Sequence, residues 1–360
     1  MATPRCSVRR SRRSSLAERL ADHTTLRTGG EARTWVEPES EAELIEVVRT
    51  ADAAGVPLLV LGGGSNVVVA DAGFDGTVVH TGRLRGVHTD DVAACSGAFM
   101  TVAAGEPWDA FVATTIATRQ VGIEALSGIP GLVGATPIQN VGAYGQEVSQ
   151  TIARVRVFDR VEQRVVTRSA VECHFGYRSS LFKAVPDRFV VLTVSFQFRL
   201  GTLSTPIRYA ELARTLGVEP GARAPMTEVR EAVLALRRGK GMVLDPEDRD
   251  TWSAGSFFTN PVVEPAVADG LPREAPRYPQ PDGRVKTSAA WLIEHAGFSR
   301  GYGSGLARLS TRHTLAITNR GGATTADVLA LAAEIRDGVE RAYGIRLVPE
   351  PVLIGAGLDT

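Results

Sequence analysis

The stretch S-G-I-P-G-L-V-G-A-T-P-I-Q-N-V-G-A-Y-G at residues 127–145 decides how the rest of the chain is interpreted. Glycine occupies five of its nineteen positions, and the stretch holds one aromatic residue and no charged one. Such a composition predicts neither a regular helix nor a well-packed strand, because ordering glycine backbone costs much entropy. We therefore expect this segment to lie against other protein or against a ligand.

A second glycine-rich stretch, L-G-G-G-S-N at 61–66, follows a buried strand that we predict at 56–61. Consecutive glycines let backbone N–H groups approach a phosphate, and Ser65 and Asn66 add donors. The stretch is not G-x-G-x-x-G, because Val67 stands where the last glycine belongs. Taken alone, it is equally well explained as a tight turn. Together, the two loops favour a large phosphate-bearing ligand such as a dinucleotide.

Composition and charge narrow the class of protein. The chain has 360 residues, enough for two or three domains, and its 40 basic and 40 acidic residues cancel. Nothing global therefore suggests nucleic acid or a membrane surface, and no apolar run is long enough to span a bilayer. The three cysteines are isolated, which favours a reducing cytoplasm over a disulfide scaffold or a metal site. The arginine-rich residues 1–15 are expected to form a disordered basic tail.

Periodicity predicts a mixed α+β chain rather than a regular βαβ array. Ser40 and Glu43 form a capping box for a helix with Leu44, Val47, Val48 and Ala51 on its apolar face. Further helices are expected from Pro107, near 207–216, near 227–238, at 287–296 and at 325–343. Antiparallel strands are expected within 151–200, the longest at 188–199, and further strands at 34–36, 67–70, 314–318, 345–348 and 351–354. Residues 264–286 contain five prolines and are predicted to be a loop or linker.

The longer stretch E-A-L-S-G-I-P-G-L-V-G-A-T-P-I-Q-N-V-G-A-Y-G at 124–145 resembles the signature of the UDP-N-acetylenolpyruvoylglucosamine reductase family. Further motifs agree in order: R-T-G-G at 27–30, L-G-G-G-S-N at 61–66, F-G-Y-R-S-S-L-F at 175–182, A-G-S-F-F-T-N-P at 254–261 and P-E-P-V at 349–352. Each motif is weak alone, but their shared order is highly specific. The resemblance runs from residue 20 to residue 355.

This resemblance implies an α+β chain with a two-lobed FAD-binding fold of the vanillyl-alcohol-oxidase (PCMH) type and a C-terminal α+β substrate-binding domain. We expect FAD-binding subdomains at 16–86 and at 87–245, the second completed by 345–360, and the substrate-binding domain at 246–344. The implied reaction is NADPH-dependent reduction of UDP-N-acetylglucosamine enolpyruvate to UDP-N-acetylmuramate through noncovalent FAD, in peptidoglycan precursor synthesis. A UDP-sugar and NADPH are then the small-molecule partners of a cytoplasmic monomer.

The chemistry of that reaction explains three residues of the shared motifs. An enolpyruvyl ether is electron-rich and accepts hydride only when its carboxylate is polarised, which the guanidinium of Arg178 can do. Hydride addition then leaves an enolic intermediate that needs a proton at the neighbouring carbon. The resemblance implies Ser256 as the proton donor and Glu350 as a third catalytic residue that orients or stabilises the intermediate. Without a catalytic role, Arg178 would be an ordinary surface residue and Ser256 would be a helix cap.

The resemblance also implies sets of binding residues. The cofactor set comprises Gly62, Gly63, Gly64, Ser65, Asn66, Ser127, Gly128, Ile129, Pro130, Gly131, Gly134, Ala135, Gln139, Asn140, Gly142, Ala143 and Tyr144. The substrate set comprises Tyr177, Tyr209, Lys240, Asn260, Lys286, Arg300 and His313. Tyr209 resembles the tyrosine of a loop that closes over the substrate in one subtype of the family. No metal ligands are expected.

Lysine is rare in this chain, with only Lys183, Lys240 and Lys286 among 40 basic residues. Two of the three fall on family positions that contact substrate. The chain departs from the family at Thr259, where lysine is common, and at Pro351, where valine is common. The first departure puts a diphosphate contact at that position in doubt, and the second predicts a small shift of the Glu350 backbone.

Two alternatives remain open at the level of sequence. One is another flavin enzyme of the same fold, such as an alcohol or hydroxy-acid oxidase. Many such oxidases bind FAD covalently through a histidine beside the glycine loop, whereas the nearest downstream histidine here is His80. The other alternative is a non-enzymatic nucleotide-binding regulator, which would not need Arg178, Ser256 and Glu350 together.

Overall fold

The computed structural model describes residues 14–15, 18–93 and 95–359. The expectation of a disordered tail at 1–15 falls mostly outside these residues. Its last two residues form β1 (Ser14–Ser15), which pairs antiparallel with β3 (Glu31–Val36). The expectation therefore does not hold for these two residues.

The first sheet combines β1, β2 (Glu18–Arg19), β3, β6 (Phe74–His80) and β4 (Leu58–Leu61), and β6 pairs in parallel with both β3 and β4. The predicted helix is α1 (Glu41–Ala53), and the Ser40 side chain accepts a hydrogen bond from the backbone of Glu43. Leu44, Val48 and Ala51 are buried as expected, and they pack with Leu58 and Val79 of this sheet. The same cluster includes Phe158 and Leu192 of the second sheet, so α1 joins the two sheets.

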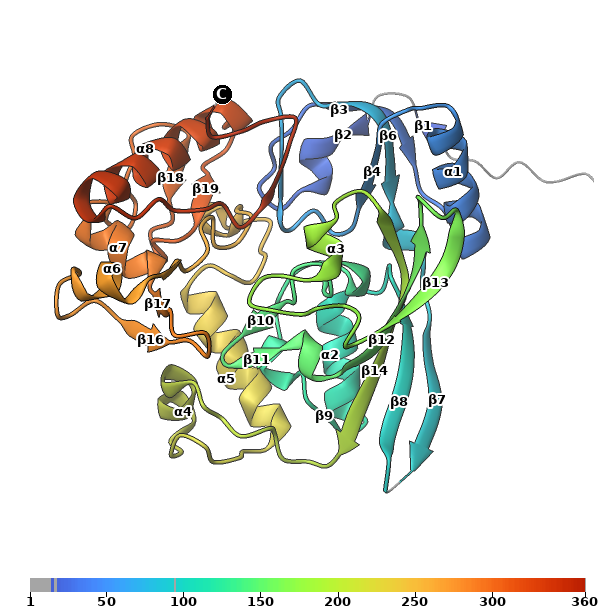
Figure 1. Ribbon diagram of the computed structural model, residues 1–360, viewed down its shortest axis with the longest axis horizontal. Coiled ribbons are helices and arrows are strands. Elements are labelled where there is room, and N and C mark those ends of the chain that lie inside the picture. Colours follow the sequence, from blue (N-terminus) through green and yellow to red (C-terminus); the bar gives the residue numbers. More distant parts are fainter. Residues whose placement is uncertain (1–13, 16–17, 94, 360) are drawn as a thin grey trace, which may run out of the picture.

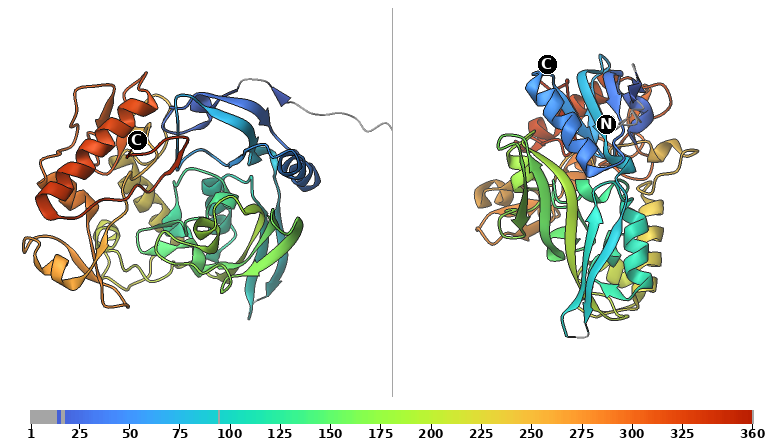
Figure 2. Two further views of the ribbon diagram at one scale, coloured as in Figure 1. Left: turned by 45° about the horizontal axis from the view of Figure 1, so that its top comes forward. Right: turned by 90° about the vertical axis from the view of Figure 1, so that its right-hand side faces the viewer.

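The second sheet is antiparallel, as predicted within 151–200. Its strands are β13 (Arg164–Ser169), β12 (Ile152–Asp159), β14 (Phe189–Leu200), β8 (Gly97–Ala103) and β7 (Val87–Ala93), with β9 (Gln120–Val121) paired to the end of β14. Helix α2 (Trp108–Ala117) begins after Pro107 and packs Trp108 and Phe111 against Phe196. Helices α4 (Ala210–Leu216) and α5 (Met226–Gly239) follow this sheet in the chain. The hairpin of β7 and β8 projects away from the rest of the molecule (Figure 2).

The C-terminal part contains the one region where the predicted loop was partly wrong. The predicted loop at 264–286 contains α6 (Pro265–Asp269), β16 (Arg277–Pro279) and the start of β17 (Val285–Thr287). These two strands form a small sheet with β15 (Val262–Val263), which immediately precedes the predicted loop. These strands are too short to show a period, and Pro265 occupies the first helical position, where a missing N–H costs nothing. The predicted helices are present as α7 (Ala289–His295) and α8 (Thr325–Tyr343), which flank the hairpin of β18 (Ala307–Leu309) and β19 (Ile317–Asn319).

The end of the chain returns to the first subdomain. Strand β20 (Val352–Ile354) pairs in parallel with β5 (Val67–Val69), which follows the first glycine loop. We expected 345–360 to complete the second subdomain, so this partner differs from the expectation, and no strand forms at 345–348. In Figure 1 the red C-terminal segment crosses to the blue N-terminal part, while the green sheet lies below both. The pairing places Glu350 between the parts.

Short single-turn elements complete the described chain. They are η1 (Leu20–His23), η2 (Thr81–Arg83), η3 (Glu124–Leu126), η4 (Val133–Ala135), η5 (Val148–Gln150), η6 (Arg249–Thr251) and α3 (Leu181–Ala184), together with the small hairpin β10 (Gly142–Ala143) and β11 (Gln146–Glu147). No helix in the described part of the chain is both long and apolar enough to cross a bilayer.

Candidate active site

Arg178 lies at the tip of a tight turn. The backbones of Gly176 and Ser179 exchange hydrogen bonds of 3.0 and 3.2 Å, which leaves Tyr177 and Arg178 as the two residues between them. Arg178 has a φ of 51°, in the left-handed region that non-glycine residues seldom occupy. Backbone strain of this kind is maintained where the surrounding structure fixes it, and it is common at functional sites.

The Arg178 guanidinium is oriented by two contacts from distant parts of the chain. Its Nε donates to Oε1 of Glu350 at 2.9 Å, and one terminal nitrogen donates to the carbonyl of Gly142 at 2.8 Å. A guanidinium has five N–H donors, so further donors remain for a ligand. The arginine is thus held in one orientation while keeping capacity to bind a carboxylate.

Glu350 connects both glycine-rich loops to Arg178. Its carboxylate is largely buried and lies 3.5 Å from Nε2 of Gln139, and the Asn66 side chain donates to its backbone carbonyl at 3.4 Å. Burial raises the pKa of Glu350, while the charge and hydrogen bond of Arg178 oppose the rise. The backbone N–H of Val352 donates to the carbonyl of Asn66, and that of Glu350 donates to the carbonyl of Phe257. Pro351, which has no N–H, therefore interrupts neither hydrogen bond.

Ser256 is placed beside Glu350 through its neighbour Phe257. The backbone N–H of Glu350 donates to the carbonyl of Phe257 at 2.8 Å, and the N–H of Phe257 donates to Leu315 at 2.7 Å. Phe257 is only 1% exposed, which anchors the segment. The Ser256 hydroxyl is half-buried and has no hydrogen-bond partner within residues 18–93 and 95–359. It is therefore available to a ligand.

The two glycine-rich loops touch each other, backbone against backbone. A Cβ on Gly63 would lie 2.7 Å from the Cα of Gly131, and the Ser65 hydroxyl donates to the carbonyl of Pro130 at 3.1 Å. A cleft of about 390 Å³ opens beside Gly63 and is lined by residues of the 21–27 segment and by His80. Backbone packed this closely beside a cleft suits the pyrophosphate-bearing dinucleotide that the sequence predicts.

Burial divides the predicted cofactor residues into two groups. Half-buried or exposed are Gly62, Gly63, Ser65, Asn66, Ile129, Pro130, Gly131, Ala135, Gln139, Gly142, Ala143 and Tyr144. Buried in this ligand-free structure are Gly64, Ser127, Gly128, Gly134 and Asn140. Ser127 donates to the carbonyl of Glu124, and Asn140 to Glu147 and Gly176. The buried group shapes the loops, so direct contact with a ligand is better supported for the accessible group.

The predicted substrate residues form two clusters. In the first, Asn260 hydrogen-bonds Tyr177, and the ammonium of Lys286 lies 4.5 Å from the centre of the Tyr177 ring. Burial and the charge of Arg178 lower the pKa of Lys286. This cluster adjoins the Arg178–Glu350 pair. Thr259, at the position where the family has lysine, hydrogen-bonds Val348 through its backbone.

The second cluster contains Lys240, which pairs with Glu211 at 2.6 Å and lies 5.7 Å from the Tyr144 ring. Tyr144 contacts Tyr209 edge to face with ring centres 5.4 Å apart. Burial lowers the pKa of His313 to about 4, and the charges of Lys240 and Arg300 add to this effect. Tyr144 belongs to the turn between β10 and β11, the hairpin whose Gly142 binds Arg178, so the hairpin connects the clusters.

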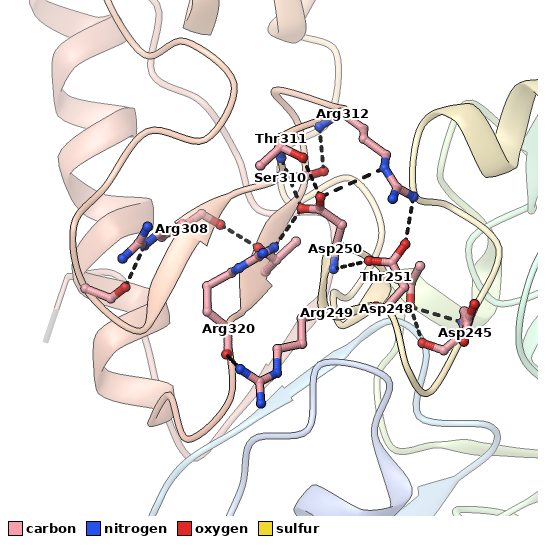
Figure 3. Close-up of polar contacts among 12 residues, drawn as sticks. Asp245, Asp248, Arg249, Asp250, Thr251, Arg308, Ser310, Thr311, Arg312 and Arg320 are labelled. Atoms are coloured by element: carbon pink, nitrogen blue, oxygen red, sulfur yellow. Dashed lines mark hydrogen bonds and ion pairs between the residues drawn. The ribbon is translucent and has the colours of Figure 1, made fainter.

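Figure 3 shows Asp250 bound to the loop at Thr311, two residues before His313 in the chain. Its carboxylate is 5% exposed and accepts hydrogen bonds from the backbone and hydroxyl of Thr311 and from Arg320 at 2.8 Å. Burial alone would raise the pKa of Asp250, but these hydrogen bonds and the charge of Arg320 lower it. Asp250 precedes Ser256 by six residues, so it joins the two loops around the site.

Sequence reasoning missed Glu211, Asp250 and the position of His80. Glu211 meets Lys240 across two helices and Asp250 meets Arg320 across two loops, so no local pattern indicated either pair. His80 lines the same cleft as Gly63, although a whole strand separates it from the glycine loop in sequence. In three dimensions a histidine therefore does share the cleft with this loop.

Comparisons with known proteins agree with the motifs. The profile described as the UDP-N-acetylenolpyruvoylglucosamine reductase C-terminal domain matches residues 245–354, and that of an FAD binding domain matches 32–167. Proteins named UDP-N-acetylenolpyruvoylglucosamine reductase from Cutibacterium acnes and Thermobifida fusca are 59% and 57% identical to this chain. The first alignment covers 93% of this chain and 89% of the relative, and the second covers 94% and 97%.

A solved structure of the reductase of this name from Thermus caldophilus gives a TM-score of 0.65 at 25% identity, covering 95% of this chain and 99% of that one. The fold class predicted from the sequence is confirmed by this similarity and by the FAD-binding profile. Because relatives above 50% identity align over nearly their whole length, the chain belongs to the UDP-N-acetylenolpyruvoylglucosamine reductase family.

Proposed function

We propose that this chain is an NADPH-dependent flavoenzyme that reduces UDP-N-acetylglucosamine enolpyruvate to UDP-N-acetylmuramate, a precursor of peptidoglycan. The observation that carries the proposal is the Arg178–Glu350 pair, which lies beside Ser256 and both glycine-rich loops. The pair supplies a fixed cation for a carboxylate, next to the Ser256 hydroxyl, which has no hydrogen-bond partner among the described residues. FAD, when bound, supplies the hydride that NADPH provides.

The residues of the chain act on the substrate in distinct ways. Arg178 binds and polarises the substrate carboxylate, and charge that develops there is stabilised by its preorganised N–H donors. Glu350 keeps the guanidinium in place through Nε. Ser256 donates a proton from Oγ to the carbon next to the carboxylate. The loops around Gly63 and Gly131 hold the cofactor through backbone groups.

The second cluster is suited to the remainder of a UDP-sugar. Lys240 and Arg300 offer positive charge for a diphosphate. A neutral His313 can accept or donate a hydrogen bond, and Tyr209 is exposed enough to move over a ligand. Lys286 and Asn260, which contact Tyr177, are suited to the end of the substrate that carries the carboxylate. We further propose that the enzyme is a cytoplasmic monomer.

An oxidase that binds its flavin covalently is the second candidate function, because His80 lines the same cleft as Gly63. His80 is however committed to Glu37 through Nδ1 at 3.1 Å and stacks on Trp35, with ring centres 5.3 Å apart. Denaturing the purified yellow protein should release all its flavin into the supernatant. Flavin that remains attached to the precipitated chain would support the oxidase.

Ser256→Ala tests the proposed reaction by separating its halves. Flavin bleaching by NADPH should proceed at close to the normal rate, because that step needs no proton from Ser256. Reoxidation of pre-reduced enzyme by the enolpyruvyl substrate should slow by about a hundredfold or more, the scale of general acid catalysis. Ser256→Cys should recover part of the loss.

Stopped-flow absorbance of the flavin measures both steps. Equal slowing of the two halves in Ser256→Ala would assign the serine to positioning. Wild-type enzyme that is reduced by NADPH but is not reoxidised by the enolpyruvyl substrate would refute the proposed function itself.

A further inference from the structure

Lys183 is the one lysine that neither the family resemblance nor the proposed mechanism uses. It lies in α3, the single helical turn that follows the Arg178 turn, and Ser180 caps this helix through the backbone of Lys183. Its ammonium donates to the backbone carbonyl of Arg178 at 3.2 Å. Lys183 therefore contacts directly the residue whose backbone is strained.

The hydrogen bond from Lys183 supports Arg178 at the residue whose backbone conformation is strained. A φ of 51° costs a non-glycine residue free energy, so the turn needs external hydrogen bonds to hold it. The Gly176–Ser179 pair supplies two, and Ser180 fixes the base of the turn by donating to the carbonyl of Ile138. Among the described residues, Lys183 is the charged side chain that hydrogen-bonds the carbonyl at the tip.

The positive charge of Lys183 also acts on the Arg178–Glu350 pair. Its charge and that of Arg178 both favour the ionised form of Glu350, against the burial that raises the pKa of this carboxyl. Burial lowers the pKa of Lys183 itself, and Glu350 opposes that change. A cleft of about 540 Å³ is lined by Lys183 together with Tyr177, Arg178 and Asn260, so the ammonium lies at the edge of the site.

We infer that Lys183 is a positioning residue for the carboxylate-binding end of the active site: it holds the Arg178 turn in its strained conformation, so that the guanidinium meets the substrate carboxylate. The inference rests on the proposed function. An ammonium suits the task because it is a flexible point donor that can reach a carbonyl five residues earlier. Lys183 itself touches no reacting atom.

Binding to the holoenzyme provides the first test, with two ligands that differ in the carboxylate. UDP-N-acetylmuramate carries the lactyl carboxylate, and UDP-N-acetylglucosamine lacks it. Titration calorimetry of Lys183→Met should show binding of the first ligand weakened by about tenfold, the scale of a charge-assisted hydrogen bond. Binding of the second should stay within about twofold, because a positioning role concerns only the carboxylate end. Lys183→Arg should restore part of the loss.

A matched control uses Arg346, which lines the same cleft but pairs with Glu340 and Asp359. Arg346→Met removes a cation from that cleft and should leave binding of both ligands unchanged. In stopped-flow experiments, Lys183→Met should slow reoxidation by the enolpyruvyl substrate by about tenfold and leave flavin reduction by NADPH unchanged. If Lys183→Met does not fold, Lys183→Leu, which also lacks a donor, replaces it with the same expectations.

Equal weakening of both ligands, or no weakening of either, would overturn the inference. A loss of the same size in Arg346→Met would do so too, because it would show a general charge effect. Failure of the wild-type holoenzyme to bind UDP-N-acetylmuramate would instead refute the proposed function, before any variant is considered. The two failures are therefore distinguishable.

Discussion

At the scale of single residues, the site depends on groups that the protein holds in unfavourable states. Arg178 has a left-handed backbone, Glu350 is a buried carboxylate with a raised pKa, and His313 is kept neutral among cations. Each state costs folding free energy and preorganises a group for a ligand. Two of these states lead to measurable predictions.

Arg178→Lys keeps the charge but cannot reproduce the present geometry. An ammonium has no planar fork, so it cannot contact Glu350, the Gly142 carbonyl and a substrate carboxylate in the same directions. We expect the enolpyruvyl half-reaction to slow by about a hundredfold, as when one preorganised donor is lost. Stopped-flow reoxidation measures the change.

Arg188→Lys is the control for this substitution, because Arg188 also donates from Nε and a terminal nitrogen, here both to Asp159 in the second sheet. It should change the half-reaction little. Near-normal reoxidation in Arg178→Lys would show that another group polarises the carboxylate.

The lowered pKa of His313 predicts that the stability of the protein depends on pH. Its pKa falls from 6.5 to about 4 on folding, so the unfolded chain binds this proton more tightly. The contribution of neutral His313 to the free energy of unfolding is complete above pH 6.5, and it is lost as the pH falls towards 4. At about 1.4 kcal/mol per pH unit, the loss amounts to at most about 3 kcal/mol.

Urea unfolding of wild type and His313→Gln between pH 7 and pH 4 checks this. The difference in unfolding free energy between the two proteins should shrink or reverse as the pH falls. Parallel curves over the whole range would contradict the lowered pKa.

At the scale of elements, the two glycine-rich loops form one structure, and their glycines have different tasks. Gly63 has no room for a side chain because Gly131 faces it. A Cβ on Gly62 would make only ordinary van der Waals contacts, at 3.6 Å from the Cβ of Ala135 and 3.9 Å from the side chain of Leu132. The protein alone therefore accepts alanine at Gly62, and any loss there must come from a ligand.

Gly62→Ala is predicted to fold with unchanged stability as apoprotein but to bind FAD more weakly, because its backbone is expected to face the cofactor. Flavin retained after purification and thermal unfolding of the apoprotein are the two measurements. Gly305→Ala is the control, since a Cβ there meets nothing within 4 Å. Full flavin loading of Gly62→Ala would mean that the loop near this residue is only a turn.

At the scale of the whole molecule, the core of the C-terminal part is completed by residues from the N-terminal part. Leu26 and Val68 of the N-terminal part are buried in the same cluster as α7 and α8. Asp71 accepts hydrogen bonds from the first backbone N–H groups of α8, at 2.7 and 3.0 Å. Strand β20 has its partner in β5. Each of these contacts crosses the proposed domain boundary.

We therefore expect the fragment 245–354, expressed alone, to lack a cooperative unfolding transition. The fragment lacks Leu26 and Val68, so the apolar side chains that pack against them would be exposed to water. Strand β20 would also lack its partner β5 and would be an unpaired edge. Circular dichroism during heating, with the full chain as control, measures this. A sharp transition in the fragment would show that the C-terminal region folds independently.

The sequence by itself determined the features that depend on neighbours along the chain. The glycine loops, the capped start of α1, the amphipathic helix α8, the antiparallel region and the family motifs are local patterns, because caps, turns and periodicity involve residues only a few positions apart. Arg178, Ser256 and Glu350 could be proposed from the sequence as candidate catalytic residues because each lies in a distinct motif.

Only the tertiary structure decided which of these pieces meet. Arg178 pairs with Glu350 across 172 residues, β20 joins β5 instead of the second sheet, and His80 reaches the cleft beside Gly63. The strands at 262–287 and the contact of Lys183 with Arg178 were equally absent from the sequence patterns. Contacts between distant residues arise from the packing of whole elements, and very short strands are stabilised by their partners rather than by their own composition.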